Sequence, residues 1–436
     1  MRTRDLMAAA VVGLVVLVAV HLLLLHTYWD YSEGVYALSS RLMLHGSDLY
    51  GQMVGAQPPG VFLTGAGLLA VHDSLEWLRF AIALLQLGAG LLAAQIVYRV
   101  TGHRLAAVLT PAAMLLTPWA VHEHGALTPE LVALPVMLGA TLLSVDRRRA
   151  GPAGVLCGVL VLIKLPFVIP AVALVMLSVD RRRTAVWAAA TLILGLAATM
   201  VLGGSGFWRD VVTAQTHTGV RSLGLLKGFW AQAGWNVLGL MVGAGVAVVA
   251  RARARDRPML DTTIALALAN VITFLTNFKV GTGLNVTVPV EASLVPLAAI
   301  GTVFAIRAAH EPERAPVQGP GRRRRGSLLA TACTAGAVFV LAQSISLIAS
   351  PHNPIPFLRA FSAPAWEITM TSQQVKASVA AARACPPGAP YGGAPLIAMI
   401  AIRLPPAGQP DGFLPLHSTT LAPVAAQIRA ARGVCG

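Results

Sequence analysis

Long apolar runs alternate with short polar, arginine-rich segments over most of the chain. An apolar helix of roughly twenty residues can cross a bilayer. The pattern predicts an all-α polytopic membrane protein with about eleven transmembrane helices, some of them short. The predicted helices cover residues 8–26, 78–98, 105–121, 127–145, 152–163, 166–179, 185–202, 234–250, 260–277, 286–306 and 327–349.

Some apolar segments are too short for a full crossing. Residues 60–72 cannot span a hydrocarbon core of about 30 Å at 1.5 Å per residue, so we expect a helix along the membrane surface. Two further short helices meet at Ile163-Lys164-Leu165-Pro166. A lysine in an apolar run is costly unless it faces water, a partner or a ligand, and broken helices occur where the backbone lines a cavity. The alternative is that Lys164 only extends from a helix end to the interface.

The distribution of basic residues predicts the orientation. Six short segments on one side of the predicted bundle hold 20 of the 33 lysines and arginines. The positive-inside rule makes that side cytoplasmic, together with the N-terminus. The extracytoplasmic side of the plasma membrane then receives a large first loop, 27–77, and a small C-terminal tail, 350–436. Residues 1–310 form the transmembrane domain, 311–326 a basic cytoplasmic linker, and 327–349 the last span.

Composition agrees with this class. Of the 436 residues, 56% are hydrophobic and only 12% are charged, which excludes an ordinary soluble enzyme. The net charge of +15 would suggest nucleic acid as the partner of a soluble chain. Here the basic clusters lie between apolar runs, so we expect the lipid bilayer as partner and no nucleic acid.

Two acids follow the first helix closely, in Trp29-Asp30-Tyr31-Ser32-Glu33-Gly34. Carboxylates this close to a bilayer indicate a functional site. Asp30 or Glu33 could act as a general base for a hydroxyl or amine acceptor. Either could instead hold a divalent cation beside a phosphate, or be a solvated loop residue; no other cofactor is expected. The prolines of Gln57-Pro58-Pro59-Gly60 fix how the loop returns to the membrane.

Several basic residues are predicted at the outer mouth of the bundle. As a set they suit a phosphate or pyrophosphate joined to a lipid tail, whereas singly they would be interfacial anchors. His122, His124 and Glu130 could bind a metal if their loop is extended, or serve in hydrogen bonding. The candidate substrate-binding residues are Tyr36, Gln57, Pro58, Arg79, His122, His124, Glu130, Lys164, Arg221, Lys227, Lys279 and Asn285.

Two further features need partners. Glu291 lies within a predicted span; either Lys279 is its partner, or it falls by chance near the outer half of the span. Cys385 and Cys435 are the two cysteines of the predicted outer tail. An oxidising compartment favours their pairing, which would close a loop of about 50 residues.

The order of these parts resembles the GT-C superfamily of integral-membrane glycosyltransferases, in particular bacterial relatives of protein O-mannosyltransferases and of lipid A aminoarabinose transferases. The resemblance covers roughly residues 8–310. Five elements carry it. The acidic motif is Asp30-Tyr-Ser-Glu33-Gly34-Val-Tyr36, the Gly-x-x-Leu-Tyr element is Gly46-Ser-Asp-Leu49-Tyr50, and the Pro-Pro motif is Gln57-Pro58-Pro59-Gly60. Arg79 is the arginine that opens the second span, and Lys164-Leu165-Pro166 is the Lys-x-Pro break.

The chain departs from the family pattern at two positions. Ser32 stands where the family has an aspartate before the glutamate, so the base is open between Asp30 and Glu33. Gln57 stands where relatives often have lysine or histidine. A lost phosphate contact at this position could be supplied by Arg221 or Lys279.

The resemblance implies a GT-C-like catalytic domain and a polyprenyl-phosphate-sugar donor. The enzyme would transfer a hexosyl or pentosyl group to an extracytoplasmic acceptor, which could be a cell-wall glycan, a lipid or a protein. An outer-loop carboxylate would serve as the base. The alternatives are a flippase or transporter of lipid-linked sugars and a non-catalytic assembly subunit. The charged residues within or near the apolar runs cluster on the predicted outer side. A transporter would need them on both faces of the bundle, so the enzyme is favoured.

Overall fold

The structure is a computed structural model, in which the described part of the chain is almost entirely helical. It describes residues 1–25, 27, 31–252, 257–275, 279, 284–310, 321–349, 370, 372–386, 389–411, 413–431 and 435. Within these residues there is no β-strand, and only two isolated bridges occur, Leu49 with Met53 and Val220 with Lys279. The predicted all-α class is confirmed.

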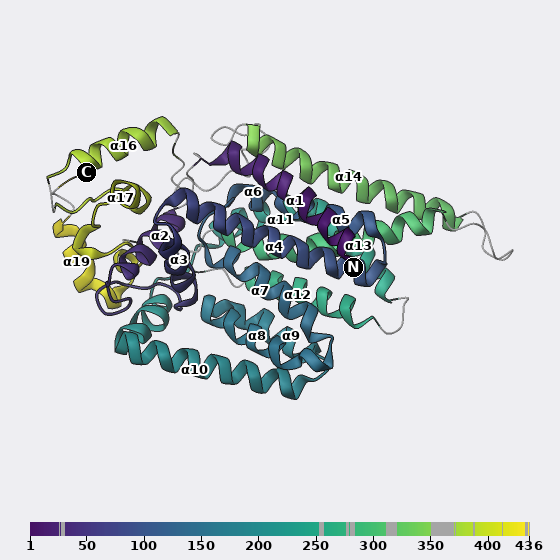
Figure 1. Ribbon diagram of the computed structural model, residues 1–436, viewed down its shortest axis with the longest axis horizontal. Helices are drawn as coiled ribbons and strands as arrows, with labels where there is room; N and C mark the ends of the chain where they lie inside the picture. Colours follow the sequence, from purple (N-terminus) through teal and green to yellow (C-terminus); the bar gives the residue numbers. More distant parts are fainter. Residues whose placement is uncertain are drawn as a thin grey trace.

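Twelve described helices form an elongated bundle (Figure 1). Seven of the described helices are long and apolar enough to cross a membrane, and shorter apolar helices complete the bundle. The chain is therefore a multi-pass membrane protein. The bundle helices are α1 Thr3–Leu24, α4 Leu75–Thr101, α5 Arg104–Leu115, α6 Pro118–His122, α7 Pro129–Ser144, α8 Ala150–Ile163, α9 Val168–Leu177, α10 Arg181–Trp208, α11 Leu223–Ala252, α12 Pro258–Leu275, α13 Val288–His310 and α14 Gly321–Ala349.

The arginine-rich segments gather at one end of the bundle, as the alternating spans require. Arg104 lies 3.8 Å from Asp5 at the start of α1. The Arg307 guanidinium donates to the Thr101 carbonyl at 2.7 Å, which joins the ends of α13 and α4. Arg251 at the end of α11 pairs with Asp261 in the first turn of α12. We call this the basic end; its assignment to the cytoplasm stays a prediction.

The opposite end carries two helices outside the bundle, α2 Tyr31–Leu44 and α3 Gly60–Val71 (Figure 1). They pack on each other, with the ring of Tyr36 edge-on to that of Phe62 at 5.6 Å. The short apolar segment predicted at 60–72 is thus a separate helix. We call this the α2–α3 end. Its position along a membrane surface stays a prediction, since no membrane is present.

Two boundaries differ from the predictions. The segment predicted as one helix, 105–121, breaks at Thr117-Pro118, where proline opens the five-residue α6. The segment predicted as a long outer loop, 203–233, is mostly helical. Helix α10 runs to Trp208 through a kink at Gly204, a π-helical turn follows at Arg209–Ala214, and α11 begins at Leu223. A helix can continue beyond the bilayer when other segments of the protein pack against it. Sequence periodicity does not reveal such packing, so the helical extent of 203–233 was not predicted.

The C-terminal region forms a small helical unit beside α2 (Figure 1). Its described helices are α16 Ser372–Ala384, α17 Pro395–Ala401, α18 Phe413–His417 and α19 Ala422–Ala431. The predicted disulfide between Cys385 and Cys435 is present. It closes a loop across a sequence separation of 50 residues, which the chain-entropy model values at about 4 kcal/mol.

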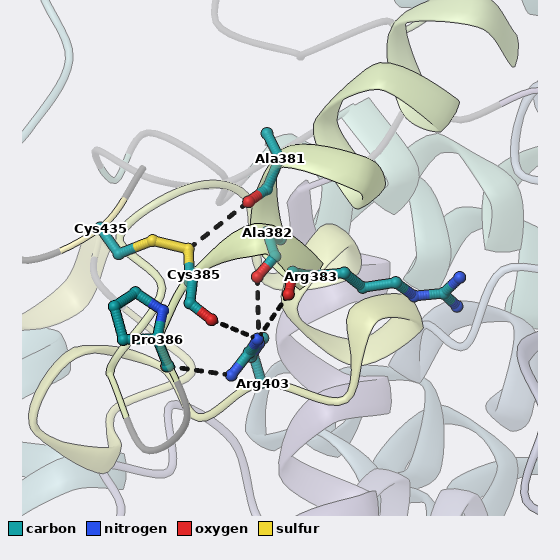
Figure 2. The surroundings of a disulfide bond; sticks show 7 residues. All are labelled: Ala381, Ala382, Arg383, Cys385, Pro386, Arg403 and Cys435. Atoms are coloured by element: carbon teal, nitrogen blue, oxygen red, sulfur yellow. Dashed lines mark hydrogen bonds between the residues drawn. A yellow bond between two sulfur atoms is a disulfide. The ribbon is translucent and has the colours of Figure 1, made fainter.

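Arg403 reinforces the disulfide (Figure 2). Its guanidinium donates to the carbonyls of Ala382 at 3.0 Å, Arg383 at 2.8 Å and Cys385 at 2.7 Å. These are carbonyls at the C-terminal end of α16, which have no partner within the helix. One cationic side chain therefore caps α16 and ties it to the segment after α17.

Candidate functional site

The break between α8 and α9 carries a buried lysine. Lys164 has an extended backbone, and Pro166 opens the 3-10 turn that follows. The side chain is only 11% exposed, and its ammonium donates to the Glu130 carboxylate at the start of α7. The other Glu130 oxygen accepts from the Asn285 amide at 3.1 Å. The ion pair offsets the cost of burying the lysine in an apolar bundle.

A second lysine lies beside this ion pair. Burial and the neighbouring charge of Lys164 lower the pKa of Lys279 to about 8, whereas Asp411 from the C-terminal region acts in the opposite direction. Asn285 Oδ1 and Thr287 Oγ1 are buried nearby in sequence, and neither accepts a hydrogen bond within the described residues. Buried polar atoms without partners indicate a place for water or a ligand. The two lysine ammonium groups therefore form a candidate anion site, to which the second N–H of the Asn285 amide and the Thr287 hydroxyl would add donors, whereas the Asn285 oxygen is an acceptor and would bind water.

Glu33 and Arg79 form a second buried ion pair. Both carboxylate oxygens accept from the guanidinium at 2.6 Å, and the Glu33 and Arg79 side chains are 1% and 5% exposed. The remaining Arg79 nitrogen donates to the carbonyls of Leu25 and Thr27, each at 2.9 Å. Arg79 therefore joins the end of α1, α2 and the start of α4. Asp30, the other predicted catalytic acid, lies outside the described residues.

The Pro-Pro motif is held next to the lysine break. A Cβ at Gly60, the first residue of α3, would lie 2.7 Å from the Leu162 carbonyl at the end of α8. Only glycine permits this approach. Before the prolines, Tyr50 has a left-handed φ of 73° and donates its hydroxyl to the Gln57 carbonyl at 2.7 Å. Helix α2, which we call the acidic helix because Glu33 lies in its first turn, thus meets the Pro-Pro turn and Lys164 at the α2–α3 end.

The predicted histidines do not gather around Glu130. His122 Nδ1 lies 3.0 Å from Glu123 Oε1, and His124 Nε2 lies 3.3 Å from His21 Nδ1. Burial lowers the pKa of His124 to about 3, so the ring is neutral. No three histidine, cysteine, aspartate or glutamate side chains are grouped to hold a metal ion in the described part of the chain.

The remaining predicted residues lie at the same end of the bundle but make no side-chain hydrogen bond or ion pair with Glu130 or Lys164 within the described residues. Pro58 is buried, and Gln57 is half-buried at the turn. Arg221 is half-buried and follows Val220, whose backbone pairs with that of Lys279. Lys227 is exposed on α11. The structure therefore separates Lys227 from the buried groups and brings together Glu130, Lys164, Lys279 and Asn285.

Glu291 has a different partner from the one expected. Its carboxylate accepts from the backbone N–H of Trp119 at 3.0 Å, at the start of α6. It thus caps a helix that begins inside the bundle, whereas Lys279 lies beside Lys164. Helix α6 was not predicted as a separate element, so its need for a cap could not be recognised.

Three polar residues of this end were missed by the sequence analysis. Burial raises the pKa of Asp210, which accepts from the Gly55 N–H at 3.1 Å. Gln409 and Asp411 belong to the C-terminal region and are 8% and 6% exposed. The sequence did carry one signal for Asp411. It is the only aspartate or glutamate after Glu367, so it stands out in the C-terminal region.

Two solved structures share this fold. The crystal structure of ArnT from Cupriavidus metallidurans bound to undecaprenyl phosphate matches with a TM-score of 0.56 and 16% identity, covering 92% of this chain and 85% of that one. The apo form of the same protein matches with a TM-score of 0.52 and 18% identity, covering 89% and 84%. No family model and no curated protein matches the chain. The chain thus shares the fold of ArnT over most of its length.

Proposed function

We propose that the chain transfers a sugar from a polyprenyl-phosphate-linked donor to an extracytoplasmic acceptor. The observation that carries the proposal is the anion site formed by Lys164, Lys279 and Asn285 at the α2–α3 end. The fold supports it, because the similar ArnT structure holds undecaprenyl phosphate. A lipid-linked phosphate needs both a cationic site for its headgroup and an apolar bundle for its tail, and this chain has both.

The two lysines would bind the donor phosphate. The phosphate would receive donors from both ammonium groups and would relieve the repulsion that now lowers the pKa of Lys279. Lys164 gives one of its three N–H donors to Glu130, whereas at least four of the five N–H donors of Arg79 are engaged by Glu33 and two carbonyls. We therefore assign Arg79 to holding the acidic helix in place rather than to the phosphate.

Asp30 is the better candidate for the general base. Both oxygens of Glu33 already accept from Arg79, so Glu33 would have to leave this pair to receive a proton. Asp30 directly precedes α2, the helix that Glu33 anchors. It would accept the proton of the acceptor hydroxyl as the oxygen attacks the anomeric carbon, and the bond from this carbon to the phosphate oxygen would break. Polyprenyl phosphate would be the leaving group.

The distribution of buried charge favours an enzyme over a transporter. Within the described residues, the buried aspartate, glutamate, lysine and arginine side chains all lie at or near the α2–α3 end: Glu33, Arg79, Glu123, Glu130, Lys164, Asp210, Glu291 and Asp411. A transporter needs polar paths toward both faces of the membrane.

The test is transfer of labelled sugar from polyprenyl-phosphate donors in membranes that carry the wild type, Asp30→Asn or Glu76→Gln. Glu76 is an exposed acid at the same end and serves as the control. We expect Asp30→Asn to lower the rate about 10²–10⁴-fold, the usual contribution of a general base, while polyprenyl-phosphate binding is retained. An Asp30→Asn variant as fast as the wild type would contradict the assignment of the base.

A further inference from the structure

The C-terminal region contacts the acidic helix directly. A Cβ at Gly34 would lie 2.5 Å from the backbone nitrogen of Leu396, at the start of α17. Arg41, on the same helix, donates to the Met399 carbonyl at 2.9 Å. The glycine that follows Glu33 thus lies where the two backbones approach each other closely. The C-terminal region is therefore fixed to the helix that the proposed base directly precedes.

The same region also binds the loop 50–57, which leads into the Pro-Pro turn. The buried amide of Gln409 accepts from the Val54 N–H at 2.8 Å and donates to the Gln52 carbonyl at 2.9 Å. Leu414 of α18 joins Val54 in a buried apolar cluster. One side chain therefore satisfies a backbone donor and a backbone acceptor of the loop, as a neighbouring strand would.

A strained turn presents Gln409 to this loop. Ala407 and Gly408, the two residues before it, have left-handed φ values of 52° and 69°. The backbone N–H groups of Gly408 and Gln409 donate to the carbonyls of Pro405 and Pro406, each at 3.0 Å. Residues other than glycine seldom adopt a left-handed backbone, and such strain gathers where function constrains the chain. The turn therefore indicates a functional constraint on the position of the Gln409 side chain.

The other half of the loop is held from the bundle. Asp210, in the π-helical turn after α10, accepts from the Gly55 N–H at 3.1 Å. Gln215, which follows this turn, donates to the Ala56 carbonyl at 2.7 Å. These two bonds fix the end of the loop nearest the Pro-Pro turn, which lies against the Lys164 break. The loop thus has one anchor in the bundle and a second anchor in the C-terminal region.

We infer that Gln409 is a positioning residue for the proposed transfer, because it couples the Pro-Pro turn to the acidic helix through the C-terminal region. We call this coupling, from Gln409 to the contact of α17 with Gly34, the bridge. The inference rests on the proposed function, in which the base precedes the acidic helix and a donor lysine lies beside the Pro-Pro turn. Without the bridge each half of the site keeps its own ion pair, but the base and the donor are no longer held in alignment. The chemical step depends steeply on such alignment.

The experiment uses the purified full chain in vesicles with an acceptor extract. It measures the transfer rate at saturating donor and, separately, the affinity for undecaprenyl phosphate. Gln409→Met keeps the length of the side chain and removes both hydrogen bonds. We expect a transfer rate lower by about 10-fold to 10²-fold, the effect of a small misplacement, with an unchanged affinity. Gln427→Met, at an exposed position of α19, is the matched control and should follow the wild type.

Breaking the bridge at its other end should have the same effect. Gly34→Ala would push α17 away from the acidic helix, so it too should lower the rate and leave the affinity unchanged. The two contacts act in series, so the double variant Gly34→Ala, Gln409→Met should be hardly slower than the slower single variant. Independent structural damage at the two positions would instead multiply the two losses.

Three outcomes would overturn the inference. They are a Gln409→Met variant as fast as the wild type, a loss of affinity that parallels the loss of rate, and losses that multiply in the double variant. A wild type that transfers no sugar from any polyprenyl-phosphate donor would instead contradict the proposed function, so the two failures are distinguishable.

Discussion

At the scale of single residues, two buried ion pairs join segments that are distant in sequence. Glu33 and Arg79 are 46 residues apart, and Glu130 and Lys164 are 34 apart. The sequence identified all four residues, because charged groups near or within apolar runs are rare. It could not pair them, since a single sequence carries no information on which spans are neighbours. The expected pairing of Glu291 with Lys279 was wrong for the same reason.

The Glu33–Arg79 pair should dominate the stability of its end of the bundle. Glu33→Gln leaves a buried guanidinium without its counter-charge, and breaking such a pair costs about 3–5 kcal/mol. We expect a lower melting temperature in detergent. Replacing both partners, Glu33→Gln with Arg79→Gln, should cost less than the sum of the single changes. Strict additivity would show that the two side chains do not act as a pair.

At the scale of elements, the break at Lys164 was predictable and the position of the tail was not. Lys164-Leu165-Pro166 interrupts an apolar run too short for two spans, so a helix end there is required. The tail offers no comparable signal. Its position on α2 depends on backbone contacts of Leu396 and Met399 with Gly34 and Arg41, which no periodicity encodes.

Gly34→Ala tests the contact between α17 and α2. The added methyl would lie 2.5 Å from a backbone nitrogen, and such overpacking typically costs about 1–3 kcal/mol. We expect the C-terminal region to be cut faster in limited proteolysis. Gly67→Ala is the matched control, because a Cβ there meets nothing within 4 Å. Equal cleavage rates in the two variants would show that α17 tolerates displacement from α2.

At the scale of the whole molecule, charge and cysteine chemistry agree on one orientation. The described arginine contacts lie at the basic end of the bundle, whereas α2, α3 and the C-terminal helices with their disulfide lie at the other end (Figure 1 shows the helices). Arginine clusters favour the cytoplasmic face, and disulfides form in oxidising compartments. Which segments lie at the same end of the bundle was therefore predictable from composition and spacing. The extent of α10 and α11 beyond the apolar runs was not.

Cysteine labelling in intact cells tests this orientation. Cys157 and Cys333 are buried, and the other two cysteines are bonded, so the background should be low. We expect a membrane-impermeant maleimide to label Glu76→Cys in intact cells. Arg148→Cys, at an exposed position of the basic end, should react only after permeabilisation. The reverse pattern would place the α2–α3 end in the cytoplasm.

The most direct test of the central claim is the choice of donor. Purified protein would be reconstituted into phospholipid vesicles with an acceptor extract freed of polyprenyl phosphate. It would be supplied with one labelled sugar, linked either to polyprenyl phosphate or to a nucleoside diphosphate. We predict transfer from the lipid-linked donor alone, and a loss of this transfer in Lys164→Gln. Transfer from the nucleotide donor, or a Lys164→Gln variant as active as the wild type, would contradict the account.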